Sequence, residues 1–227
     1  MYEYGSRAGV WRVLRLFDSR ELPLTAFAVG RALELNPAVG QTLRDAGHEV
    51  AGHGYRWIDY REVGEGEERR HIHRTVEIIE ATCGARPVGW YTGRVSGNTR
   101  RLVREEGGFL YSSDAYNDDL PYWLDGPTPH LVIPYTLVNN DARYLMSAGY
   151  SSGDDFFHAL KDAFDLLWLE GAERPKMMSV GLHGRISGHP ARAAALARFL
   201  DYVQGRDAVW ICRRDAIARY WATEYPP

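Results

Sequence analysis

Short apolar runs alternate with stretches of helical spacing along most of the chain. Residues 24–29 form a nearly continuous apolar run with β-forming side chains, a pattern typical of a strand covered on both faces. A second run lies at 49–52. Further strand candidates are found at 88–91, 109–113, 131–135, 177–183 and 209–212.

Helical spacing separates these runs. The clearest helix ends at Gly84, and its apolar stripe at i, i+4, i+7 and i+11 consists of Ile72, Val76, Ile79 and Cys83. Another helix is expected from Pro37, which suits a first turn after the cap Asn36, to Gly47. The remaining helices are expected from Ser6 to before Pro23 and over 98–106, 154–170, 190–203 and 213–221.

The order of these elements predicts the fold class. Strands that alternate with helices indicate right-handed βαβ crossovers, so we predict an α/β fold with a mainly parallel sheet. One domain could use all 227 residues. The longest irregular stretch, 114–130, contains three prolines, Pro121, Pro127 and Pro129, and is too long for a routine connection. We therefore expect it to form part of a site.

Charge and cysteine content narrow the classes of partner. The chain has 27 Lys and Arg against 30 Asp and Glu, a formal charge of −3. No basic excess exists for a phosphate backbone or an anionic membrane, so neither nucleic acid nor a membrane is expected as a partner. Cys83 and Cys212 fit no metal or redox spacing, and no secretory or membrane-spanning run occurs. We therefore expect reduced thiols and a cytoplasmic protein.

Polar side chains follow several of the predicted strands. His53 and Asp114 each come just after a predicted strand, His183 closes another, and Arg94 follows Tyr91 and Thr92 beyond a fourth. In a parallel barrel the active site lies at the carboxyl ends of the strands, so these side chains are candidates for one shared active site. Each also has a structural interpretation, because a histidine can be hydrogen-bonded, an aspartate can cap a loop and an arginine can form an ion pair.

The histidines do not have the spacing of a metal site. A second ligand could stand four residues after His53, but that position is Trp57. His71 and His73 lie two apart on a predicted helix, so they point in different directions and are expected at the surface. The sequence therefore predicts no metal ligands.

Five segments together resemble the polysaccharide deacetylase (NodB-homology) superfamily, and more narrowly its allantoinase branch. The resemblance runs from Tyr2 to Trp221. The segments are GHGYRWIDY at 52–60, RPVGWYTGR at 86–94, YSSD at 111–114 with DDLPYW at 118–123, and GLHGR at 181–185. The resemblance implies a distorted, incomplete (β/α) barrel, one catalytic domain over 1–227, assembly as a homo-oligomer such as a tetramer, and hydrolysis of carbon–nitrogen bonds outside peptides.

Two departures from the family pattern carry further expectations. Trp57 stands where metal-dependent members have a second metal-binding histidine, so the resemblance implies a metal-free reaction without a cofactor. The family's first strand, with an acidic motif, would precede Tyr2, so we expect this strand to be missing and the barrel to have an exposed edge.

The resemblance also assigns roles to individual residues. His183 would transfer a proton to the leaving nitrogen or activate water, because an imidazole titrates near working pH. His53 would donate to a substrate carbonyl or share the base role, and Asp114 would orient a histidine or bind ring N–H groups. The expected substrate-binding residues are Arg94, Trp57, Trp90, Tyr91 and Asp119, and the aromatic ones could equally be core residues.

The leading hypothesis is a cyclic-amide hydrolase that converts allantoin to allantoate in purine catabolism, with a small cyclic ureide as its partner. One alternative is a polysaccharide or peptidoglycan N-deacetylase that uses a divalent metal such as zinc. The other alternative, from a different class, is a truncated and inactive homologue that only folds against partner subunits.

Overall fold

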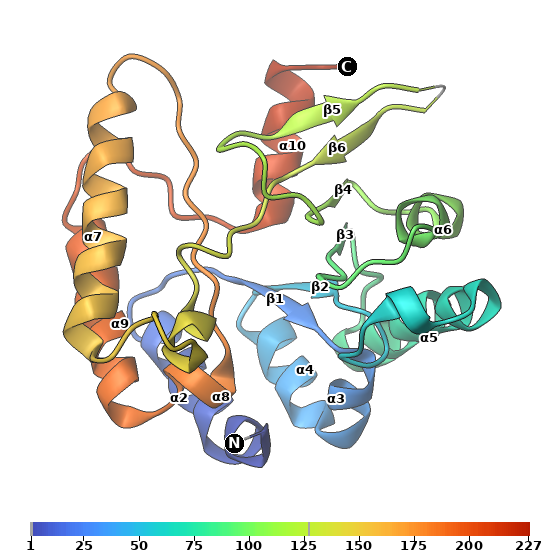
Figure 1. Cartoon of the computed structure of the whole chain (residues 1–227), viewed down its shortest axis with the longest axis horizontal. Coiled ribbons are helices and arrows are strands. Elements are labelled where there is room, and N and C mark those ends of the chain that lie inside the picture. The colour runs from blue at the N-terminus through green and yellow to red at the C-terminus, as the bar shows by residue number, and fades with distance from the viewer. Residues whose placement is uncertain (1, 127) are drawn as a thin grey trace. The chain divides into compact units, whose positions relative to one another are not determined.

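The computed structural model describes residues 2–126 and 128–227 (Figure 1). The chain packs as two compact units that each combine several separate segments. The first unit consists of Met1–Leu22, Tyr116–Leu120 and Tyr135–Ile211, and the second of Pro23–Ala115, Pro121–Pro134 and Cys212–Pro227.

The second unit contains the sheet. Its six strands are β1 (Thr25–Ala28), β2 (Glu49–Gly52), β3 (Gly89–Trp90), β4 (Tyr111–Ser112), β5 (Tyr122–Leu124) and β6 (His130–Val132). Their order is β1-β2-β3-β4-β6-β5, and every neighbouring pair is parallel except β5 with β6. The prediction of an α/β fold with a mainly parallel sheet is confirmed. Because β1 and β5 are both edges, the sheet is consistent with an incomplete, distorted barrel.

Six helical elements within residues 2–126 and 128–227 belong to the second unit. They are α3 (Gly30–Leu35), α4 (Pro37–Asp45), the short 3-10 helix η2 (Tyr60–Glu62), α5 (Glu65–Cys83), α6 (Thr99–Glu106) and α10 (Arg214–Glu224). The predicted stripe of α5 is buried, and the helix ends at Gly84 with φ +76°. A glycine suits this left-handed position because it has no Cβ.

Side chains alternate between the two faces of this sheet. A Cβ at Gly52 would lie 2.4 Å from the Trp90 ring, and one at Gly89 would lie 2.2 Å from the Tyr111 ring. Trp90 and Tyr111 therefore pack over opposite faces. The Trp90 face packs against Ile72 of α5 and against α6, whereas on the Tyr111 face the tyrosine hydroxyl donates to Glu49 at 2.9 Å.

The first unit is mainly helical. Its elements are α1 (Tyr2–Tyr4), the π-helical turn η1 (Gly5–Gly9), α2 (Val10–Asp18), η3 (Asp141–Leu145), α7 (Gly153–Glu170), α8 (Gly184–Ser187) and α9 (Pro190–Gln204). Helix α7 begins with a capping box in which Ser152 and Asp155 satisfy each other's backbone. It packs along α9 (Figure 1).

Several local predictions differ from the structure. The predicted strand at 177–183 contributes only an isolated bridge between Gly181 and Asn140, and 209–212 is not a strand. The predicted strand at 131–135 is β6 at His130–Val132. Helix α3 was not predicted, and the stretch 114–130 contains β5. No helix within residues 2–126 and 128–227 has the length and apolar character needed to cross a membrane.

Candidate functional site

His183 of the first unit is held by a buried carboxylate. Its Nδ1 lies 2.6 Å from Oδ1 of Asp141, a side chain with 0% exposure. The other oxygen, Oδ2, accepts hydrogen bonds from the His183 backbone N–H at 2.8 Å and from the Ser187 hydroxyl at 2.6 Å and backbone N–H at 3.1 Å. Both oxygens of Asp141 are therefore engaged by fixed donors.

This arrangement selects one tautomer of His183. Because an ionised carboxylate only accepts hydrogen bonds, Nδ1 must carry the proton and Nε2 is left with its lone pair. The His183 side chain keeps 24% of its surface exposed, so the imidazole is reachable while its orientation is fixed. The pair can take up a proton at Nε2 and stabilise the resulting imidazolium.

The loops that carry the two residues are tied together at the backbone. The Asp141 N–H donates to the carbonyl of Gly181 at 2.9 Å, and the Gly181 N–H donates to Asn139 at 2.8 Å. Sequence reasoning missed Asp141 because no periodic element leads to it. The available signal was Asn140, whose side chain accepts from the Ala142 N–H and caps η3.

His53 of the second unit follows β2, as expected. Its Nδ1 lies 2.7 Å from the carbonyl oxygen of Tyr91, so this nitrogen donates and Nε2 keeps its lone pair. The His53 and Tyr91 rings are stacked, with centroids 5.0 Å apart and an angle of 13° between their planes. Phe27 packs against both rings. The structure thus brings His53 and Tyr91 together as an aromatic pair.

Trp57 and Arg94 also lie together. The Arg94 guanidinium carbon lies 4.2 Å from the centroid of the Trp57 ring, and both side chains are exposed. The arrangement is a cation–π contact. Among residues 2–126 and 128–227, no three His, Cys, Asp or Glu side chains are grouped in a way that could hold a metal ion.

Asp114 lies differently from the expectation. Its carboxylate accepts hydrogen bonds from the backbone N–H groups of Thr92 and Gly93, the closest at 2.7 Å. It lines a cavity with Ser112 and His130 on the Trp90 face of the sheet. Burial raises the pKa of Asp114 to about 6, while the amide hydrogen bonds oppose this shift. The contacts match the loop-capping interpretation.

Two expected substrate-binding residues also lie elsewhere. Trp90 is 1% exposed and packs in the core, and its indole N–H donates to Thr92 at 2.8 Å. It is therefore a core residue rather than an open wall for a substrate. Asp119 of the first unit is exposed, and its charge acts on Lys176.

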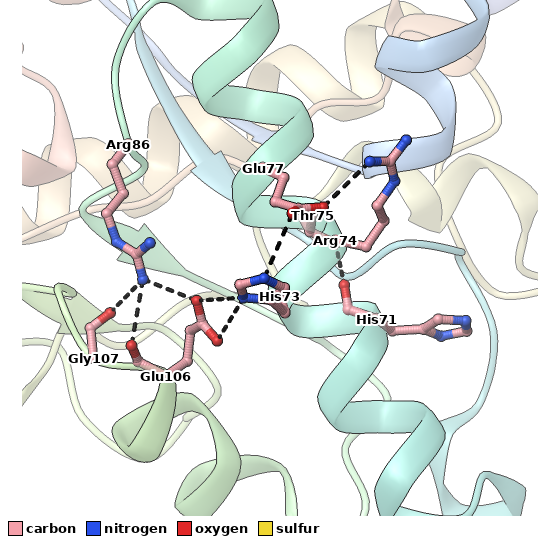
Figure 2. Close-up of polar contacts among 8 residues, drawn as sticks. All are labelled: His71, His73, Arg74, Thr75, Glu77, Arg86, Glu106 and Gly107. Carbon is pink, nitrogen blue, oxygen red and sulfur yellow. Dashed lines mark hydrogen bonds and ion pairs between the residues drawn. The ribbon is translucent and has the colours of Figure 1, made fainter.

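Figure 2 shows the two histidines on α5. His73 is directed at Glu106, with 3.3 Å between Nδ1 and Oε1, and His71 points away from it. The expectation that they point in different directions is confirmed. His73 is at the surface, but His71 is largely buried and its Nδ1 lies 3.2 Å from the Tyr60 hydroxyl.

Comparisons with known proteins give a consistent family. Residues 1–107 match the polysaccharide deacetylase family. A putative polysaccharide deacetylase of Schizosaccharomyces pombe is 40% identical over 243 residues, covering 99% of this chain and 76% of the relative. The crystal structure of a probable polysaccharide deacetylase from Pseudomonas aeruginosa PAO1 is 57% identical with a TM-score of 0.97. The crystal structure of Puue allantoinase is 55% identical, also with a TM-score of 0.97. In both structures the match covers 100% of this chain and 76% of the other.

Proposed function

The chain belongs to the polysaccharide deacetylase family, whose members are hydrolases acting on carbon–nitrogen bonds, and from this premise we propose that it opens the ring of a cyclic ureide, with allantoin as substrate. The observation that carries the choice of substrate concerns Trp57. This residue stands four positions after His53, and the Arg94 guanidinium lies over its ring. The similarity to Puue allantoinase over the whole chain supports the same choice.

The deacetylase alternative requires a divalent metal, and the residues around His53 do not fit one. The indole of Trp57 offers no lone pair to a metal ion. The adjacent Arg94 guanidinium carries a positive charge that disfavours a second cation nearby. An indole and a guanidinium can instead contact a planar, carbonyl-rich ring by stacking and by bidentate hydrogen bonds.

We assign the proton transfers of the reaction to His183. Hydrolysis of a ring amide needs a water that loses a proton and a leaving nitrogen that gains one. The Nε2 atom of His183 takes the proton from water as the carbon–oxygen bond forms, and it returns a proton to the nitrogen as the carbon–nitrogen bond breaks. Asp141 stabilises the imidazolium between the two steps. A positioned base of this kind contributes typically ~10²–10⁴-fold in rate.

His53 has a supporting role in this proposal. With Nδ1 fixed on the Tyr91 carbonyl, its Nε2 can accept a hydrogen bond from a ring N–H. The other neutral tautomer carries its proton on Nε2 and would lose the hydrogen bond from Nδ1 to the Tyr91 carbonyl. Donation from Nε2 to a substrate carbonyl therefore requires the doubly protonated ring.

We also propose that the chain assembles as a homo-oligomer. Sedimentation analysis of the purified chain would test this assembly.

The test is a comparison of two substrates on the purified full chain. We expect ring opening of allantoin, followed as allantoate formed, that is unchanged by a strong chelator. His183→Ala should abolish turnover, whereas the matched control His73→Ala, at an exposed position, should leave it intact. Release of acetate from an N-acetylated chitin oligomer, lost on chelation, would instead establish the deacetylase function. Absence of both activities would support the inactive homologue.

A further inference from the structure

A cavity of about 250 Å³ lies in the second unit between α6 and the Trp90 face of the sheet. Ser112 and His130 line it from the strands, and Thr99 and Arg100 line it from the helix. His53 and Tyr91 are not among its lining residues. The volume is somewhat below the ~300–1,000 Å³ of pockets for drug-sized ligands, so its occupant must be small.

The strand side of the cavity offers a neutral Ser112–His130 hydrogen-bonded pair and the carboxylate of Asp114. The Nε2 atom of His130 lies 2.9 Å from the Ser112 hydroxyl. Burial lowers the pKa of His130 to about 4, with the charges of Arg104 and Arg100 adding to the effect, so the ring is neutral at pH 7. Asp114 accepts hydrogen bonds from the backbone N–H groups of Thr92 and Gly93 and from the Thr92 side chain, so it contributes mainly its negative charge to the cavity.

The helix side offers one cation. Arg100 lies in the first turn of α6, and its charge acts on both Asp114 and His130. Its side chain is exposed and makes no hydrogen bond or ion pair with the residues that the structure describes. The neighbouring Arg101, in contrast, pairs with Glu105 at 2.9 Å. Arg100 is therefore available to a ligand.

The rim of the cavity is fixed in advance. Glu68 is 1% exposed and accepts a hydrogen bond from the Ser96 hydroxyl at 2.6 Å and another from Thr99. The Ser96 N–H in turn donates to the Thr99 hydroxyl at 2.8 Å. A ligand therefore does not have to order this segment, which lowers the cost of binding.

We propose that this cavity binds a small carboxylate that also carries an amide or ureido group. The carboxylate pairs with Arg100, and the N–H groups donate to the acceptor that the Ser112–His130 hydrogen bond leaves open, beside the negative charge of Asp114. The apolar part of the ligand lies against Val95 and Val103. A simple anion would be repelled by Asp114, and a simple cation by Arg100, so both functional groups are needed. The residues that form this site belong to the second unit alone, and the proposal does not depend on the reaction proposed above.

The test uses N-carbamoylglycine as the probe, which carries both groups, with titration calorimetry on the purified full chain. We expect binding of this probe and at least tenfold weaker binding of acetate or urea. Arg100→Gln should weaken binding of the probe at least tenfold, and Arg101→Gln, on the next helix position, should not change it. Both positions are exposed, so both variants should fold, which circular dichroism would verify.

Three results would overturn the inference. They are an unchanged dissociation constant in Arg100→Gln, equal affinity for acetate and the probe, and no binding of the probe at all. A chain that fails to open allantoin but still binds the probe through Arg100 would refute the proposed function alone.

Discussion

Replacement of Asp141 by asparagine tests how His183 is held. Asparagine has nearly the same shape, but it offers one acceptor oxygen and one NH₂ group where aspartate has two acceptors. If the NH₂ faces Nδ1 of His183, the ring must adopt the other tautomer and Nε2 loses its lone pair. If the NH₂ faces the opposite way, it meets the N–H groups of His183 and Ser187, which then lose their acceptor.

The size of each effect follows from these four hydrogen bonds. A wrong tautomer removes the base, so kcat should fall by about the ~10²–10⁴-fold that a positioned base contributes, with little change in KM. Buried donors left without acceptors cost about 1–3 kcal/mol in free energy of unfolding. Asp141→Asn should therefore lose both activity and stability.

The assay combines steady-state kinetics, urea unfolding and nitrogen NMR of the His183 imidazole, which reports the tautomer directly. The matched control is Asp201→Asn, a carboxylate of the same unit that lies at the surface and pairs with Arg20. It should leave kcat unchanged and alter the unfolding free energy by less than about 1 kcal/mol. A kcat within threefold of wild type in Asp141→Asn, with the Nδ1–H tautomer retained, would refute the positioning role.

Three further outcomes are expected. Burial raises the pKa of Asp114 from 3.8 to about 6. The protonated carboxyl group therefore stabilises the fold below pH 4, and this contribution, on the order of 3 kcal/mol, is lost as the pH rises through 6. Asp114→Asn should flatten this part of the profile of unfolding free energy against pH, measured by urea unfolding. Trp57→Ala should raise KM for a ring substrate while changing the free energy of unfolding by less than about 1 kcal/mol, because its contact with Arg94 is exposed. Tyr111→Phe should destabilise the second unit by about 1–3 kcal/mol in chemical unfolding, because buried Glu49 loses a donor.

Each of these outcomes has a contrary result, and two of them have a matched control. Asp118→Asn is the control for Asp114, and a pH profile that stays the same in Asp114→Asn would contradict the assigned titration. An unchanged KM in Trp57→Ala would remove Trp57 from the substrate site. Tyr220→Phe, at an exposed position of α10, is the control for Tyr111, and equal stability of the two variants would contradict the role of the Glu49 contact.

The periodic elements could be predicted because their signal is local. The stripe from Ile72 to Cys83 predicts the body and the end of α5 but not its first turns. The apolar run at 24–29 locates β1. The stretch 177–183 shows the limit of such reasoning. It is apolar enough for a strand, but within the described residues 2–126 and 128–227 its backbone has an isolated bridge to Asn140 and no further strand partner. Strand pairing depends on which segments the rest of the fold places beside it.

The positions of the two aspartates depend on contacts that no local pattern encodes. Asp141 meets His183 across 42 residues of sequence, and neither position has a repeating neighbour pattern that points to the other. Asp114 follows a strand of two residues, too short for alternation to show which face it takes. The structure places it beside Ser112 on the Trp90 face.

This placement changes which carboxylate can serve the chemistry. Asp141 is fully enclosed, and the hydrogen bonds to its carboxylate come from His183 and from Ser187 of α8. Any movement of the carboxylate would therefore also move the imidazole. Asp114 instead holds the amides of Thr92 and Gly93, which precede Arg94 in the chain. Loss of Asp114 should therefore alter binding through the position of Arg94, and loss of Asp141 should alter proton transfer. Loss of Asp114 should then change mainly KM, and loss of Asp141 should change mainly kcat. If both carboxylates acted on the same histidine, the two variants would change the same constant.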